Sequence, residues 1–189
     1  QSSGLQEINN TFHTVQKPKE GLEPILEMNL AKFYAEVTWV RKYRIADDAD
    51  PDAIKIVGVI SGQYCSTGKS GMCRFLSRPG QPPHRFEATL EQATVPVAWK
   101  AAKAASATPV VYQMQTRPER RGKPEPAEVH VELTTENAKP GDEVELRVTV
   151  LLDEGYHTYS NTMADGNSAV PTSFEVGRIN GLEEITTEF

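Results

Sequence analysis

The residues best suited to chemistry are Cys65 and Cys73, which are the only cysteines in the 189-residue chain. They stand at the two ends of a loop rich in Gly and Ser, and an apolar run beginning at Ile56 leads into the first of them. Residues 61–86 include no acidic residue, although the whole chain has a net charge of −6. The same stretch holds four basic residues, namely Lys69, Arg74, Arg78 and Arg85. Because nearby positive charge favours the thiolate, this pair of thiols indicates redox chemistry.

Two kinds of disulfide fit these cysteines. Thiol–disulfide exchange needs one thiolate that attacks a partner's disulfide and a second thiol that resolves the mixed disulfide. Cysteines facing each other across a hairpin supply both, provided that their Cα atoms come within about 7 Å. The alternative is a structural disulfide, which would close a loop of nine residues and stabilise the fold by roughly 2–3 kcal/mol. The residues alone leave both interpretations open and do not assign which cysteine attacks.

Other motifs in the chain do not predict a metal or cofactor site. A C-x7-C pair without a second pair is a poor zinc signature, and His84 would supply only a third ligand. The aspartate-rich segment 46–52 lacks the Gly and the terminal Glu of an EF-hand loop, so it indicates an exposed turn. Residues 68–70 read Gly-Lys-Ser, but Gln63 stands where a phosphate-binding loop requires Gly.

His157 is the histidine with the most suggestive neighbours. It is flanked by Tyr156 and Tyr159 and has the residue type of a general base or a metal ligand. No Ser, Cys or carboxylate motif accompanies it, so we expect it to pack in a strand at the end of a β-sandwich. The other histidines lie in strand or loop contexts with nothing convergent, namely His13, His84 and His130.

The composition favours β structure and excludes some classes of function. Val, Thr, Ile, Gly and Pro are common, whereas helix formers do not dominate. The acidic balance, with a pI of about 5.3, argues against general nucleic-acid binding, which requires a basic face. No apolar run approaches the roughly 20 residues that a membrane-spanning helix needs.

Runs of apolar or alternating residues predict a series of strands without a βαβ rhythm, for which a β-sandwich is the natural solution. The expected strands lie at residues 33–45, 54–65, 84–90, 129–133, 144–150, 156–160 and 170–176. A short helix is possible at 97–105, where Ala and Lys predominate. Residues 116–126 are charged and rich in proline, which is typical of a linker and suggests a domain boundary.

The two ends of the chain carry an internal match. Residues 4–12 and 181–189 agree at five of nine positions, at an offset of 177. The match suggests tandem modules, with residues 1–91 as the back part of one module, 92–126 as a linker and 127–189 as the front part of the next. Each module would then lack strands from sequence outside the chain, and without a starting Met the chain is expected to be a piece of a longer protein.

Several short motifs, in order, carry a resemblance to a known family. Residues 36–38 read Glu-Val-Thr, 56–60 lead to Tyr64-Cys65, a second cysteine follows, and 85–90 form another expected strand. In the second half, Lys-Pro-Gly at 139–141 precedes a strand, and 155–160 fit the pattern Gly-aromatic-His-x-Tyr. In these features the chain resembles parts of two tandem copies of the N-terminal, immunoglobulin-like periplasmic domain of DsbD-type thiol:disulfide interchange proteins.

The resemblance implies a protein of the bacterial cell envelope or periplasm, and an activity as part of a protein-disulfide reductase. In that family the two cysteines are a redox-active pair, which accepts electrons from a membrane partner and passes them to thioredoxin-like periplasmic proteins. Carried over, the pair is Cys65 and Cys73. The loop between them is longer than is usual in the family, and residues 74–76 read Arg-Phe-Leu rather than aromatic-Pro-Pro. The alternative function is a non-catalytic β-sandwich interaction module with a structural disulfide.

Overall fold

The computed structural model describes the greater part of the chain, namely residues 12–23, 26–49, 54–68, 71–76, 84–89, 114–116, 119–120, 123–134, 139–163 and 169–184. Within these residues every regular element is a β-strand and no helix occurs. The predicted all-β class is therefore confirmed. The helix expected at 97–105 and the first repeat segment, apart from Phe12, lie outside the described residues.

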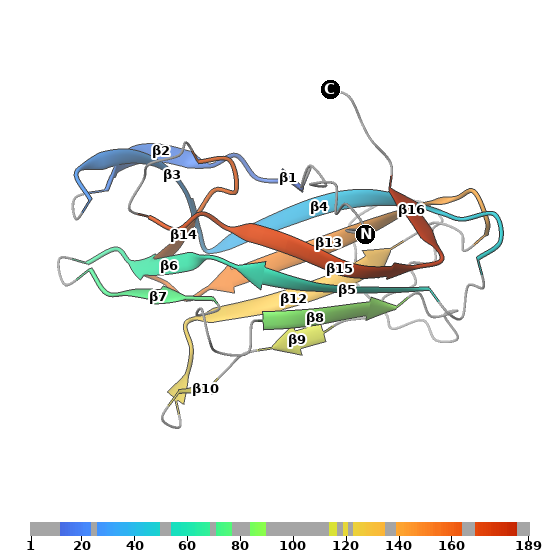
Figure 1. The fold of residues 1–189 in the computed structure, drawn as a ribbon. Helices are drawn as coiled ribbons and strands as arrows, with labels where there is room; N and C mark the ends of the chain where they lie inside the picture. Colours follow the sequence, from blue (N-terminus) through green and yellow to red (C-terminus); the bar gives the residue numbers. More distant parts are fainter. Residues whose placement is uncertain are drawn as a thin grey trace, which may run out of the picture.

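The strands form a sandwich of two packed layers, and every strand pairing is antiparallel (Figure 1). One layer is a six-stranded sheet, made of β1 (His13–Thr14) and β16 (Leu182–Glu184) along one edge, then β4 (Glu36–Ile45), β13 (Glu143–Leu152), β12 (Ala127–Thr134) and β9 (Met114–Thr116). A separate small hairpin consists of β10 (Glu119–Arg120) and β11 (Lys123–Pro124).

The opposite layer consists of two shorter sheets placed end to end. The five-stranded sheet has the order β2 (Lys19–Glu23), β3 (Met28–Tyr34), β14 (Tyr156–Tyr159), β6 (Gln63–Ser66) and β7 (Cys73–Phe75). The three-stranded sheet has the order β15 (Ser173–Asn180), β5 (Lys55–Ser61) and β8 (His84–Thr89). Since β5 runs directly into β6, the chain passes there from one of these sheets into the other (Figure 1).

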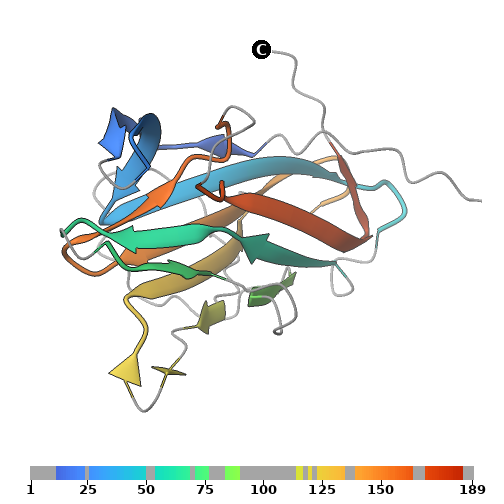
Figure 2. The same ribbon diagram turned by 60° about the vertical axis from the view of Figure 1, so that its left-hand side comes forward.

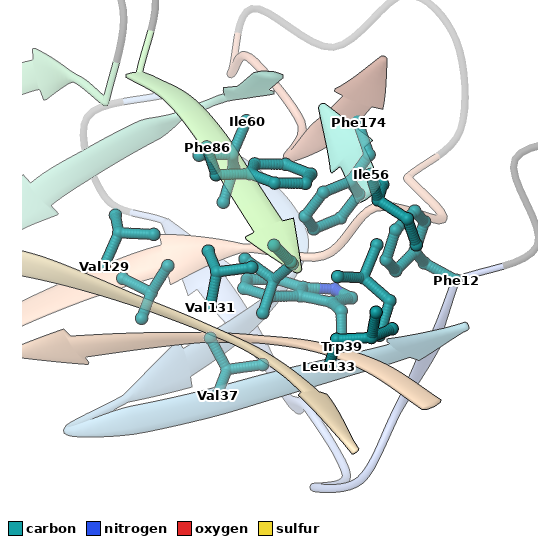
Figure 3. Packing of buried hydrophobic residues seen from close by; sticks show 14 of the residues in the cluster. Phe12, Val37, Trp39, Ile56, Ile60, Phe86, Val129, Val131, Leu133 and Phe174 are labelled. Carbon is teal, nitrogen blue, oxygen red and sulfur yellow. The ribbon is translucent and has the colours of Figure 1, made fainter. Parts of the chain in front are cut away.

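The core lies between the layers and follows the predicted alternation. Inward residues of β12 and β13 are buried, namely Val129, Val131, Leu133, Val144, Leu146, Val148 and Val150. Figure 3 shows residues of the three-stranded sheet, including Ile56 and Phe86, pointing towards Trp39 of the six-stranded sheet. Burial of each large apolar side chain contributes about 1.5–3 kcal/mol, so this alternation accounts for much of the stability of the sandwich.

Two segments that were each predicted as one continuous strand are each divided into two strands in the structure. The strand expected at 33–45 breaks at Ala35, whose φ of 63° is unusual for a residue with a side chain, and the chain passes there from one layer to the other. The strand expected at 54–65 breaks at Gly62, where a Cβ atom would lie 3.2 Å from the Cα of Thr172. Such breaks let a strand switch sheets at the corner of a sandwich, which the apolar pattern did not reveal.

The two segments that the sequence assigned to separate modules share their sheets within this chain. β13 pairs with β4, β14 lies between β3 and β6, and β15 pairs with β5. In both views blue and teal strands of the first segment lie beside orange and red strands of the second (Figures 1 and 2). Both β1, near the first repeat segment, and β16, within the second, pair with β4. The tandem arrangement itself stays a prediction.

Candidate functional site

The hairpin of β6 and β7 brings the two predicted site residues together. Cys65 lies directly opposite Cys73 in the strand register, with Cα atoms 4.0 Å apart and an S–S bond of 2.06 Å. Cys65 is completely buried, whereas Cys73 is partly exposed. Of the two cysteines, only Cys73 is therefore in contact with solvent.

The disulfide belongs to a row of directly opposed residues that crosses the five-stranded sheet. Tyr34 of β3 faces His157 of β14, His157 faces Cys65, and Cys65 faces Cys73. The same side of the sheet carries a small apolar cluster, separate from the main core, that contains Leu30, Cys65, Tyr159 and Ala169, with Leu26, Met28, Cys73 and Met163 packed against it. Because opposed residues share a face of the sheet, His157 is placed beside the disulfide.

A chain of buried polar groups leads to the buried sulfur. The hydroxyl of Tyr159 donates a hydrogen bond of 3.2 Å to Cys65 Sγ. His157 Nε2 lies 3.3 Å from that hydroxyl oxygen and 3.2 Å from Glu23 Oε2. Lys32 Nζ binds the same glutamate oxygen at 3.2 Å. We call Glu23, Lys32, His157 and Tyr159 the sulfur-side network, and each is at most 5% exposed.

Burial sets the protonation states in the sulfur-side network. Burial lowers the pKa of His157 from its ordinary value, even though the charge of Glu23 opposes this. Burial also raises the pKa of Tyr159, and the negative charge of Glu23 adds to the effect. At neutral pH the imidazole is therefore neutral and the phenol keeps its proton, since in both cases the uncharged form is favoured.

A second polar cluster lies next to the cysteines but does not touch their sulfurs. Tyr64 and Arg74 face each other across the hairpin, and both bind one oxygen of Glu125, at 2.6 Å and 2.8 Å. Glu125 precedes β12 and is buried. Burial, followed by the hydrogen bond to Glu125, raises the pKa of Tyr64, and the same carboxylate raises the pKa of Arg74. We call these three residues the Glu125 clamp.

The basic residues that the sequence placed around the cysteines do not gather at the sulfurs in the described part of the chain. Arg74, expected to favour a thiolate, has its guanidinium on Glu125. Of the other basic residues in that stretch, Arg85 is exposed on β8, and Lys69 and Arg78 lie outside the described residues. The charge of the hairpin is therefore partly compensated by a carboxylate from the expected linker.

The histidine was predicted as a packing residue, and its partners were missed. His157 is buried in β14 as expected, but it contacts Glu23 and Tyr159. One signal was available, because residues two apart in a strand share a face, so His157 and Tyr159 lie on the same side of β14. Nothing local to Glu23 indicated that its carboxylate would meet them.

The described part of the chain contains no group of three or more His, Cys, Asp and Glu side chains arranged to hold a metal ion. Among those residues there is also no helix with the length and apolar character to cross a bilayer. No protein-family model matches this chain, and no curated protein or solved structure matches it either. The chemistry available at the site is that of a disulfide between a buried and a partly exposed cysteine, with a phenol hydroxyl that donates to the sulfur of the buried one.

Proposed function

We propose that the chain carries out thiol–disulfide interchange with protein partners through the Cys65–Cys73 disulfide, as an immunoglobulin-like module of the bacterial cell envelope. The observation that carries the proposal is the asymmetry of the two sulfurs. Cys73 is partly exposed, whereas Cys65 is buried and accepts a hydrogen bond from Tyr159. A disulfide that opens from one side needs an accessible sulfur and a stabilised leaving thiolate, and the asymmetry of the two cysteines supports both requirements.

The exchange begins at the accessible sulfur. A thiolate of the partner attacks Cys73 Sγ, the bond between the two sulfurs breaks, and its electron pair stays on Cys65 Sγ. The second thiolate of the partner then attacks the partner's own sulfur in the mixed disulfide and releases Cys73 as a thiolate. The partner is oxidised to a disulfide, and the two protons that its thiols lost return through solvent to the two cysteines. The reverse direction uses the same steps.

Exposed apolar residues near Cys73 in the chain and in the sheet support a protein substrate. Met72 is 56% exposed and Phe75 is 38% exposed, immediately before and two residues after Cys73. Val170, also 38% exposed, lies close by, since its backbone N–H donates to the side chain of Gln63, the residue paired with Phe75. Apolar side chains grouped at a surface are typical of protein-binding sites, and the resemblance to the DsbD-type domain suggests thioredoxin-like partners.

The competing function is a non-catalytic interaction module in which the disulfide is only a staple. The apolar cluster around Cys65 favours it, because a buried sulfur among Leu30, Tyr159 and Ala169 also suits a permanent crosslink. In that case the bond would mainly restrict the unfolded chain.

The reduction potential separates these two functions. The oxidised protein is equilibrated with glutathione or dithiothreitol buffers, and the fraction of reduced Cys65 and Cys73 is measured by alkylation. Interchange predicts rapid reduction and a potential above about −300 mV. A potential below about −300 mV together with slow reduction would reject the proposal.

A trapping variant tests the assigned order of attack. With Cys65→Ser, the remaining Cys73 is expected to form a stable mixed disulfide with a thioredoxin-like protein that keeps a single cysteine and is supplied as its mixed disulfide with glutathione. Cys73 displaces glutathione, and no resolving thiol is then left on either protein. Cys73→Ser is the matched control and is expected to trap far less, since its remaining sulfur is buried. Equal trapping by both variants would contradict the assignment of Cys73 as the attacked sulfur.

A further inference from the structure

We infer that Glu23, Lys32 and His157 are positioning residues that direct the hydroxyl proton of Tyr159 onto Cys65 Sγ. The inference rests on the proposed interchange and adds to it a defined role for the sulfur-side network. Among the described residues, the hydrogen bond to the disulfide comes from Tyr159, so Glu23, Lys32 and His157 act through its hydroxyl.

The carboxylate of Glu23 fixes the tautomer of His157. An ionised carboxylate only accepts hydrogen bonds, and Glu23 Oε2 lies 3.2 Å from His157 Nε2. Nε2 must therefore carry the proton, because a bare nitrogen lone pair would face a negative oxygen. The other ring nitrogen, Nδ1, is buried without a hydrogen-bond partner among the described residues. A proton on Nδ1 would be an unsatisfied buried donor, so both observations favour the same tautomer.

The tautomer in turn fixes the direction of the Tyr159 hydroxyl. A protonated Nε2, whose single proton faces Glu23, cannot accept a hydrogen bond from the hydroxyl oxygen 3.3 Å away. The phenol proton is then left for Cys65 Sγ at 3.2 Å. If Nε2 were unprotonated, the hydroxyl would have a nitrogen acceptor, which is a better acceptor than sulfur.

Lys32 holds the carboxylate in place. Its ammonium binds Glu23 Oε2 and the backbone oxygen of Leu22, each at 3.2 Å. The groups that face His157 thus come from four strands, with Glu23 from β2, Lys32 and Tyr34 from β3, Tyr159 from β14 and Cys65 from β6. The hairpin of β2 and β3 therefore contributes to the state of a sulfur on β6.

The expected consequence is a stabilised Cys65 thiolate. A hydrogen bond to a charged acceptor is strong enough to shift an ionisation equilibrium by about tenfold or more. This thiolate leaves when the partner opens the disulfide, and in the reverse direction it attacks the mixed disulfide. The burial of Tyr159 keeps the proton on the phenol, so the hydroxyl stabilises the thiolate without being consumed.

The test measures ionisation of Cys65 in the Cys73→Ser variant, from thiolate absorbance as a function of pH. Tyr159→Phe in that background is expected to reduce the thiolate fraction at a given pH by about tenfold. Glu23→Leu combined with Lys32→Met removes the ion pair with little change of volume, and we expect a loss in the same direction. Tyr64→Phe is the matched control, because Tyr64 adjoins Cys65 but binds Glu125, and its thiolate fraction should not change.

A variant that combines Tyr159→Phe with Glu23→Leu and Lys32→Met distinguishes a positioning role of the ion pair from a merely structural one. When Tyr159 is already Phe, replacing Glu23 and Lys32 should have no further effect on ionisation. An equal further loss, or no loss from the ion-pair variant in the presence of Tyr159, would overturn the inference.

His157 provides a second measurement if the ion-pair variant folds poorly. His157→Gln keeps a side-chain N–H that can donate to Tyr159, whereas His157→Phe does not. We expect Gln to retain more of the thiolate than Phe, and equal losses would overturn the inference. Both tests use reduced, single-cysteine protein, so they stand apart from the reduction potential, whose failure would reject the proposed interchange instead.

Discussion

Two clusters, each built on a tyrosine and a glutamate, lie on opposite sides of the cysteine hairpin. In the sulfur-side network Tyr159 donates to Cys65 Sγ and Glu23 is linked to it through an imidazole. In the Glu125 clamp, Tyr64 donates directly to the carboxylate. The difference is which group accepts the hydrogen bond from the phenol, a sulfur in one cluster and a carboxylate in the other.

The strand pleat explains how both clusters fit around one hairpin. Tyr64 and Cys65 are neighbours in β6, so their side chains point to opposite faces of the sheet. Tyr64 belongs to the main core between the layers, and Cys65 to the small outer cluster. Glu125 thus contacts the hairpin on the face towards the core. The sulfur-side network contacts Cys65 on the outer face.

The largest expected effect comes from breaking the buried ion pair. Glu23→Ala leaves the ammonium of Lys32, which is 5% exposed, without its carboxylate, and we expect a loss of about 3–5 kcal/mol in the free energy of unfolding. Urea unfolding of the oxidised protein measures it.

The control replaces both partners. Glu23→Leu with Lys32→Met removes the two charges together, and replacing a buried pair by apolar residues is often nearly neutral. A double variant as unstable as Glu23→Ala would show that the pair is essential to the fold and not only to the sulfur.

A smaller effect is expected on the other side of the hairpin. Glu125→Ala leaves the buried hydroxyl of Tyr64 without its acceptor, at an expected cost of about 1–3 kcal/mol. Arg74 is 29% exposed in its side chain, so its guanidinium can be hydrated and adds little to the loss. The free energy of unfolding is measured by urea, and Cys65 ionisation should stay unchanged. A changed ionisation would mean that the two clusters are not independent.

The sulfur-side network should also make stability depend on acidity. The pKa of His157 is lowered in the folded protein, while the unfolded chain has an ordinary value of about 6.5. Stability is complete above that pH and falls as the pH drops through it, because the unfolded imidazole binds a proton that the folded one does not. The loss reaches at most about 1.4 kcal/mol per pH unit.

His157→Gln serves as the comparison, since it carries no titrating ring. Urea unfolding of both proteins at about pH 7.5 and about pH 5.5, a range on either side of the free imidazole's pKa, gives the difference in their stabilities. That difference should shrink at the lower pH as the wild type loses its advantage. A constant difference would contradict the assignment of a neutral buried imidazole.

The alternation of apolar residues was sufficient to predict the buried face of a strand that packs on a single core. The alternation at 144–150 and 129–133 predicted the inward faces of β13 and β12, which are buried. The spacing of Cys65 and Cys73 likewise predicted a disulfide across a hairpin, because the two partners are local.

The alternation of apolar residues did not predict where the chain passes from one sheet to another, nor where distant residues meet. Ala35 and Gly62 lie inside apolar runs, and nothing in alternation marks a switch of sheets. The contacts of the two clusters span 94 residues from Cys65 to Tyr159 and 61 from Tyr64 to Glu125. Glu125 stood in a charged, proline-rich run whose composition is typical of a solvated linker, and only its tertiary contacts make it a buried residue.

The smallest expected effect on the free energy of unfolding comes from replacing each of the two tyrosines by Phe. Tyr64→Phe removes one hydrogen bond but leaves Glu125 paired with Arg74, so we expect a loss of about 0.5–1.5 kcal/mol in the free energy of unfolding. Tyr159→Phe should cost a similar amount, since its hydroxyl also makes a single donated bond, to Cys65 Sγ. The two variants should differ in the rate at which dithiothreitol opens the disulfide, which falls for Tyr159→Phe and not for Tyr64→Phe. If both variants slow the opening equally, the rate depends on the rigidity of the hairpin and not on which group accepts the hydrogen bond of the phenol.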